Sequence, residues 1–276
     1  NTASGYYALN GTTSGTGNSG FGSQALYLNL TGISNSAFGL NALYNNTGSY
    51  NTAVGATSLF SNTTASYNTA VGHQAGYSNT TGAYNAYVGK GAGFSGVTAS
   101  SATAVGFEAL YNNTANINTA IGMYAGRSNT SGDTNFFGGY AAGYGVTTGS
   151  QVTFVGAYSG PSTSTTSTGT RNTGYGYSAL SVVTSANDNT GIGPNSLVST
   201  TTGSNNTAVG SSAGYKNTTG AGNTYVGYQA GYADIYLIDR TRGALSRVSI
   251  ANGLEAAADA QLEDIRLGSD GALSIA

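Results

Sequence analysis

Few side chains in this sequence could carry out acid–base or metal chemistry. His73 is the only histidine, and there is no cysteine to supply a thiolate. His73 occupies a position in a repeated motif that is taken elsewhere by Ala56, Lys90, Met123 or Ser211. A position that accepts such different side chains is typical of a solvated surface. We therefore expect no catalytic or metal-binding role for His73.

Carboxylates are also sparse. Residues 1–231 hold only Glu108, Asp133 and Asp188, each in a different copy of the repeat. Glycoside hydrolysis needs two carboxylates facing one substrate, and a Ser-His-Asp arrangement needs an acid near the histidine. Three further acids cluster near the C-terminus at a spacing that suits a solvated helical face better than a calcium loop: Asp259, Glu263 and Asp264. We predict that the chain is not an enzyme and binds no cofactor or metal.

Aromatic side chains are better candidates for binding. The sequence has 21 tyrosines and 8 phenylalanines, and one aromatic position recurs along the chain. Its tyrosines are the candidate binding residues: Tyr27, Tyr44, Tyr77, Tyr111, Tyr144, Tyr215 and Tyr232. Regular aromatic stacking is first a packing device and could lie at an interface between chains. Where the rings face solvent, they would offer flat apolar platforms with hydroxyl groups, suited to sugar rings or to a protein partner.

These residues belong to a repeated unit of about 17 residues, which is the signature of a solenoid. The motif Asn-Thr-Ala-Val-Gly stands at 51–55, 68–72 and 206–210, and looser copies fill the intervals. We align the copies on their closing glycines: Gly5, Gly22, Gly39, Gly55, Gly72, Gly89, Gly106, Gly122, Gly138, Gly156, Gly176, Gly193, Gly210 and Gly227.

Each unit predicts two short strands and two turns. The Thr-Ala-Val tract favours a strand, and a second strand is expected through Ala-(Leu/Gly)-Tyr, as at 25–27 and 75–77. The sequence Asn-Thr-Thr-Gly at 79–82 predicts a turn in which glycine supplies a positive φ. Alternation along the first strand places the branched residue on one face and alanine on the other. We predict a core ladder of branched residues: Val54, Val71, Val88, Val105, Ile121, Val155, Ile192, Val209 and Val226.

The predicted fold is therefore all-β: a two-sided parallel β-roll of about 14 coils, a rod on the order of 65 Å long at ~4.8 Å per coil. A roll this thin buries little by itself, so its remaining apolar face is expected to need a partner, most simply another copy of the chain. The period is irregular at 138–160, and residues 161–170 form a low-complexity insertion that we expect on an exposed edge.

Charge density rises at Tyr232, which marks a boundary. We assign residues 1–231 to the solenoid and 232–276 to a C-terminal cap or the start of a further β domain. In the second part we predict strands at 234–239, 244–250 and 272–276 and a short helix at 254–265. The net charge of −2 does not indicate nucleic-acid binding, and no apolar run is long enough for membrane insertion. The sequence begins inside a repeat, so we expect it to be part of something longer.

The Asn-Thr-Ala-Val-Gly units of residues 1–231 resemble the head repeats of trimeric autotransporter adhesins and similar repeats of phage and bacterial tail fibres. This resemblance implies a left-handed parallel β-roll, three chains side by side, and an exposed fibre that attaches to a host or matrix. The period is longer in this sequence than in the best-known heads of these adhesins, and tyrosine is more abundant. Residues 234–249 and 269–271 resemble one blade of a TolB-like β-propeller.

We accordingly expect an adhesive fibre segment on a cell surface or a virion tail: an extracellular homotrimer that binds a surface glycan or protein without catalysis. Three alternatives stay open. One is a polymerising extracellular filament, and another is a glycan depolymerase whose active site lies outside this segment. The third is an ice- or mineral-binding solenoid, suggested by Thr52, Thr69, Thr119 and Thr207, although alternation places these threonines on the predicted inward face with the valines.

Overall fold

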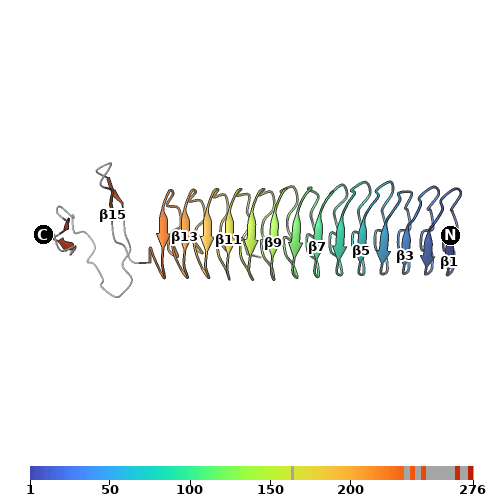
Figure 1. Ribbon diagram of the computed structural model, residues 1–276, viewed down its shortest axis with the longest axis horizontal. Coiled ribbons are helices and arrows are strands. Elements are labelled where there is room, and N and C mark those ends of the chain that lie inside the picture. Colours follow the sequence, from blue (N-terminus) through green and yellow to red (C-terminus); the bar gives the residue numbers. More distant parts are fainter. Residues whose placement is uncertain (163–164, 233–236, 240–243, 247–264, 268–272, 276) are drawn as a thin grey trace.

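A single parallel sheet of 14 strands runs through the molecule, each strand paired with the next in sequence (Figure 1). The computed structural model describes residues 1–162, 165–232, 237–239, 244–246, 265–267 and 273–275. The sheet consists of β1 (Thr2–Ser4), β2 (Ser19–Phe21), β3 (Ser36–Phe38), β4 (Thr52–Val54), β5 (Thr69–Val71), β6 (Ala86–Val88), β7 (Thr103–Val105), β8 (Thr119–Ile121), β9 (Phe136–Gly138), β10 (Thr153–Val155), β11 (Thr173–Tyr175), β12 (Thr190–Ile192), β13 (Thr207–Val209) and β14 (Thr224–Val226). The predicted all-β solenoid with a period near 17 residues is confirmed.

Equivalent residues of successive coils lie directly above one another. Between β4 and β5, for example, Thr52 pairs with Thr69 and Val54 with Val71. No helix occurs in the described part of the chain, and therefore none there is long and apolar enough to cross a membrane.

The register at β9 differs from the sequence alignment by one residue. Gly138 pairs with Ile121 on one side and Val155 on the other, so it occupies the strand position of the branched residue. The closing glycine of this coil is Gly139, whose φ of 127° matches the 136° of Gly122. Placing the copy at Gly138 was wrong, and the interval that follows is regular. The lengthened period lies between Gly156 and Gly176, which are 20 residues apart and enclose the low-complexity stretch 161–170.

Each coil contains one strand rather than two. The predicted second strand, as at 25–27, is a turn in which Gln24 and Leu26 have φ values of 57° and 54°. Left-handed residues at alternate positions prevent an extended strand. The coils remain connected there, because the backbone N–H of Leu26 donates to the carbonyl of Ala42 at 3.0 Å.

Alanine, not valine, points into the coil. Ala53 and Ala70 are fully buried, whereas Val54 and Val71 are each 37 % exposed. The predicted core ladder of branched residues is therefore wrong for the single chain. Its members lie on the outer surface of the sheet, exposed or, in one case, half-buried: Val54, Val71, Val88, Val105, Ile121, Val155, Ile192, Val209 and Val226. The coil is so thin that the strand's alanine and one leucine from the opposite wall fill it, which leaves no room for valine.

The interior volume is kept constant by exchanges between these two walls. Where the strand contributes Ala53, the opposite wall contributes the buried Leu59. Where it contributes Tyr87, the opposite positions in the same and the preceding coil are Gly93 and Gly76, and a Cβ on either glycine would meet the tyrosine ring. One ring thus replaces two leucines. Phe137 and Tyr225 are accommodated by glycines in the same way, whereas Phe154 lies against Gly160 and against Gly174 of the next strand.

Buried asparagines connect the coils. The backbone N–H of Asn68 donates to Oδ1 of Asn51 at 2.9 Å, and its Nδ2 donates to the carbonyl of Gly82 at 2.9 Å. Nδ2 of Asn79 donates to the same carbonyl at 2.9 Å, which confirms the predicted turn. Gly82 does not have a positive φ, so our reason for the glycine was wrong. Glycine suits this position because a Cβ would meet the carbonyl oxygen of Ala99 in the next coil.

The insertion rejoins the ladder before it ends. Ser167 forms an isolated parallel bridge with Val146, and its N–H donates to the carbonyl of Gly145 at 2.9 Å. In the C-terminal region β15 (Leu237–Asp239) pairs antiparallel with β16 (Ala244–Ser246), and β17 (Ile265–Leu267) with β18 (Leu273–Ile275). The three predicted strands are found where they are described. The predicted helix lies outside the described residues except for Ile265, which begins β17.

Candidate functional site

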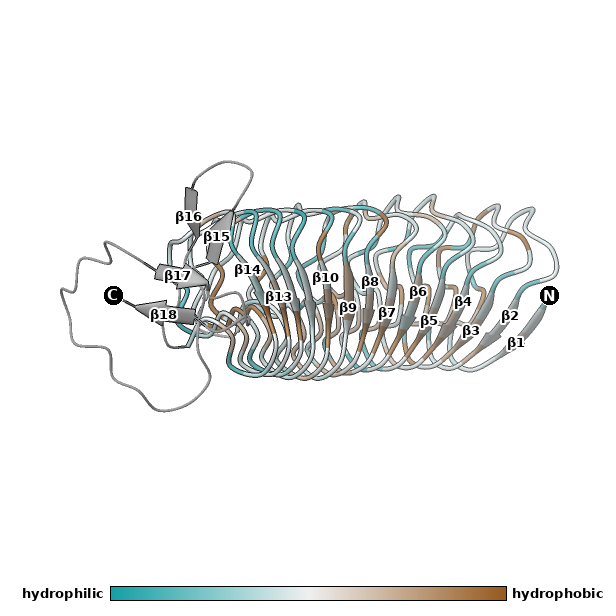
Figure 2. Cartoon of the chain, turned by 60° about the vertical axis from the view of Figure 1, so that its left-hand side comes forward, coloured by the Kyte–Doolittle hydropathy of each residue, from teal (hydrophilic) through white to brown (hydrophobic). Residues whose placement is uncertain are grey.

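The outer surface of the sheet carries a continuous apolar face. In most strands the first and third residues point outward, and these are mainly threonine and valine or isoleucine. We call the outward residues of β1–β14 the Thr/Val face; Figure 2 shows its strands following one another along one side of the rod. Phe21 and Phe38 stack on this face with ring centroids 5.0 Å apart. The face has no partner within the described part of the chain.

The threonines of the ice-binding alternative lie on this outer face. Thr69 and Thr207 are exposed, and Thr52 and Thr119 are half-buried. The prediction that they point inward with the valines is wrong: the two residue types share a face, but that face is the outer one. The sequence argument against an ice-binding surface therefore no longer holds.

The predicted tyrosine ladder is continuous only in the first half of the rod. Six rings stack nearly parallel with centroids 4.8–5.3 Å apart, and we call them the aromatic stack: Tyr27, Tyr44, Phe60, Tyr77, Phe94 and Tyr111. All are half-buried. Each ring covers the face of its neighbour, so the stack presents ring edges to solvent rather than open platforms.

The other three candidates lie apart from the aromatic stack. Arg127 occupies the ladder position between Tyr111 and Tyr144, with its guanidinium carbon 5.0 Å and 5.7 Å from the two ring centroids. Tyr215 and Tyr232 form an exposed pair near the end of the solenoid, 5.7 Å apart. The structure therefore brings together four of the seven predicted tyrosines and separates the rest.

A second tyrosine ladder was missed. Tyr50, Tyr67 and Tyr84 stack with centroids 5.0 and 5.2 Å apart, and they are 47–64 % exposed. Each stands directly before the asparagine of the repeated motif, so its regular spacing was visible in the sequence.

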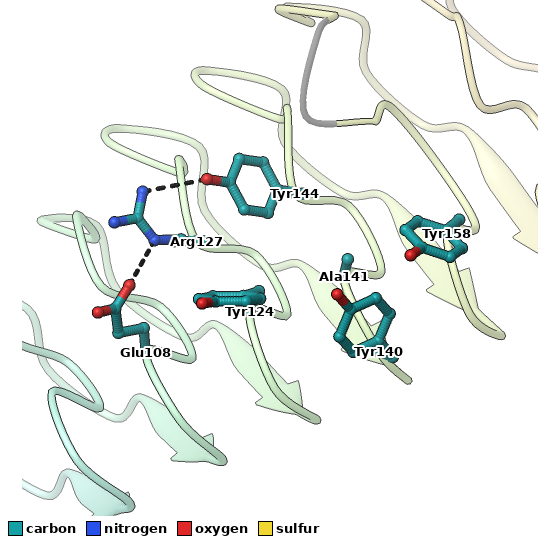
Figure 3. A pocket seen from close by; sticks show the side chains of 7 residues that line it. All are labelled: Glu108, Tyr124, Arg127, Tyr140, Ala141, Tyr144 and Tyr158. Atoms are coloured by element: carbon teal, nitrogen blue, oxygen red, sulfur yellow. Dashed lines mark hydrogen bonds and ion pairs between the residues drawn. The ribbon is translucent and has the colours of Figure 1, made fainter.

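Repetition fails most clearly around Arg127. Its Nε donates to Oε2 of Glu108 at 2.7 Å, and its Nη1 donates to the hydroxyl of Tyr144 at 3.2 Å (Figure 3). Burial lowers the pKa of Arg127, but the hydrogen bonds to Glu108 and Tyr144 outweigh it, so the net pKa is raised. The guanidinium is therefore a fixed cation whose charge is balanced by its neighbour.

These side chains border a hollow of about 340 Å³, the Arg127 hollow, lined by Glu108, Tyr124, Arg127, Tyr140, Ala141, Tyr144 and Tyr158. In Figure 3 Ala141 lies between Tyr144, Tyr140 and Tyr158, and Tyr124, Arg127 and Glu108 lie on one side of it. The residue two positions after the closing glycine is Tyr124 in the preceding coil and Tyr158 in the next, so the small side chain of Ala141 leaves a gap one coil wide. A hydrogen bond to Tyr140 raises the pKa of Tyr158.

Rings beside the hollow are arranged edge to face rather than stacked. The interplanar angle is 67° between Tyr124 and Tyr140 and 82° between Tyr140 and Tyr158. Of the lining residues, only Tyr144 was a sequence candidate. The available signal was chemical: an arginine in an aromatic ladder position and a glutamate nearby, in a solenoid with few charges.

His73 is exposed, as its variable position predicts. Among the described residues, no group of three or more histidine, aspartate or glutamate side chains is placed to hold a metal ion. The chain matches no protein-family model, no curated protein and no solved structure with which it was compared.

Proposed function

We propose that the solenoid is a segment of a homotrimeric, extracellular adhesive fibre, which attaches a cell or virion to a surface glycan or protein and performs no catalysis. The observation that carries this proposal is the Thr/Val face, which runs along all 14 strands with all its valines but Val155 exposed. Monomeric soluble proteins rarely expose contiguous apolar patches larger than a few hundred Å².

A second copy of the chain suits this face better than an unrelated protein would. Every copy carries the same ladder with the same spacing of ~4.8 Å per coil, so rows of side chains can interdigitate along the whole rod. Val71 and Val88 are 37 % and 39 % exposed. Burying what remains exposed of one valine stabilises by roughly 0.5–1 kcal/mol, and the gain repeats in nearly every coil. We propose three chains, rather than another number, because the repeats resemble those of trimeric fibre heads.

Charges placed on the face test the proposal. We expect the triple variant Val71→Asp, Val88→Asp, Val105→Asp to keep its fold, because these side chains already reach solvent in the single chain, and to dissociate into monomers, because an unpaired buried carboxylate costs several kcal/mol. Val97→Asp is the matched control, since Val97 is 42 % exposed but lies outside the strands. Light scattering with circular dichroism separates dissociation from unfolding. An unchanged mass for the triple variant would refute the proposed interface.

Ice binding is the second candidate, because the outward Thr-x-Val pattern repeats every ~4.8 Å on a sheet surface. Bulky rings interrupt that surface at Phe21, Phe38, Phe136 and Tyr175, which favours a protein partner over a flat crystal plane. Thermal hysteresis no greater than that of buffer would exclude this candidate, while hysteresis from a monomer would favour it over the fibre.

A further inference from the structure

We infer that the Arg127 hollow is a binding site for neutral sugar residues of a surface polysaccharide. The inference rests on the proposed attachment role and gives it a place on the molecule. Of the seven charged residues in 1–231, two meet in this hollow, as the Arg127–Glu108 ion pair. The rod has a second ion pair, Arg171–Asp188, but the Arg127–Glu108 pair is the more buried of the two, and this is the first indication of a binding site.

The ion pair is arranged to bind hydroxyl groups. Arg127 uses Nε for Glu108 and Nη1 for Tyr144, which leaves Nη2 with no hydrogen-bond partner in the described residues; Oε1 of Glu108 is likewise without one there. The ion pair therefore offers one free donor and one free acceptor to sugar hydroxyls, because each hydroxyl can both donate and accept. The guanidinium is already neutralised by Glu108, so the hollow holds no excess positive charge that would favour an acidic sugar.

Aromatic geometry at this place differs from that of the aromatic stack. In the aromatic stack the rings hide each other's faces, with Phe94 and Tyr111 only 2° from parallel. Around the hollow Tyr140 and Tyr158 meet edge to face at 82°, so one ring of this pair keeps both faces free of the other, and Tyr140 is 42 % exposed. An uncovered aromatic face beside polar groups is what a sugar ring needs, since its C–H surface packs on the ring while its hydroxyls find partners.

The gap at Ala141 is what makes the hollow, and it can be closed without disturbing the coil. Ala141 has a φ of 52°, and tyrosine occupies the equivalent position in neighbouring coils with φ values of 62° at Tyr124 and 57° at Tyr158. Ala141→Tyr is therefore compatible with the backbone and fills the hollow. Gln74→Tyr is the matched control, because Gln74 has the same place in its own coil, a φ of 59°, and no part in the hollow.

The experiment measures binding of the full chain to soluble dextran, laminarin, mannan and galactan, with alginate and hyaluronate as anionic probes and gelatin as a protein probe. Affinity electrophoresis and quenching of tyrosine fluorescence report binding. We expect at least one neutral polysaccharide to bind, Ala141→Tyr to weaken it by about tenfold or more, a change of ~1.4 kcal/mol in binding free energy, and Gln74→Tyr to leave it unchanged.

Failure to bind any neutral polysaccharide, preference for an anionic probe or for gelatin, or equal binding by Ala141→Tyr would each overturn the inference. Light scattering on the same samples keeps this result distinct from the proposed function. A trimer that binds no neutral sugar would refute the sugar site alone, whereas a monomer would refute the fibre.

Discussion

The exchange between Tyr87 and two leucines gives a sharp test of how the coil is filled. Tyr87 is buried, and its ring fills the space that a side chain on Gly76 or Gly93 would occupy. Tyr87→Ala should leave a cavity and lower the free energy of unfolding by about 3–5 kcal/mol. Tyr84→Ala is the matched control: Tyr84 is 64 % exposed, so its loss should change stability by less than about 0.5 kcal/mol.

Other coils of the repeat show which substitutions should restore the stability lost in Tyr87→Ala. Leu59 and Leu110 occupy the position of Gly93 in other coils, are fully buried, and have φ values of 48° and 49°, close to the 62° of Gly93. Gly93→Leu alone should destabilise, because its Cβ would meet the Tyr87 ring. The triple variant Tyr87→Ala, Gly76→Leu, Gly93→Leu buries two leucines at roughly 1.5–3 kcal/mol each, so it should recover most of the stability lost.

Urea unfolding followed by circular dichroism measures these differences. A triple variant no more stable than Tyr87→Ala, or a Tyr87→Ala variant as stable as Tyr84→Ala, would show that the ring does not replace two leucines in the coil.

Two further predictions concern buried polar groups. The Tyr87 hydroxyl has no hydrogen-bond partner in the described residues, so Tyr87→Phe should be as stable as the parent or more stable by ~1 kcal/mol in urea unfolding. Burial also raises the pKa of the Tyr87 hydroxyl above its usual 10.0. The stability that the protonated hydroxyl contributes is fully present below pH 10.0 and is lost as the pH rises through the raised pKa of the folded state, so the parent should lose more stability at alkaline pH than Tyr87→Phe does. Equal alkaline stability profiles of the two proteins would contradict this. Asn68→Ala removes two buried hydrogen bonds of the asparagine side chain, one to the carbonyl of Gly82 and one from the N–H of Asn85. It should lower the free energy of unfolding by about 2–3 kcal/mol, whereas a change below ~1 kcal/mol would show that the asparagine ladder is dispensable.

The repeat predicted the solenoid because equivalent residues of successive coils must stack to satisfy one another. Which strand residues face the interior of the coil could not be predicted from the repeat. Alternation separates Ala53 from Val54 but does not say which lies inside, and hydrophobicity alone favours valine. The width of the coil decides, and that width depends on the opposite wall, where Leu59 sits at a positive φ that is unusual for leucine.

Two other features depended on contacts that the motif does not encode. At Phe136-Phe137-Gly138-Gly139 either glycine could close the unit; the fit of Phe137 between Gly126 and Gly143 selects the register. The Arg127 hollow is formed by side chains from four coils at positions that vary freely among the repeats. The sequence shows each of these residues, but it does not show that they lie together in the folded chain.

If the Thr/Val face is buried between copies of the chain, the mass of the unmodified protein in solution must be that of an oligomer. Light scattering should give about three times the 27.5 kDa of one chain, independent of dilution over the micromolar range. A mass of 27.5 kDa with the solenoid intact would show that the face is not buried between copies.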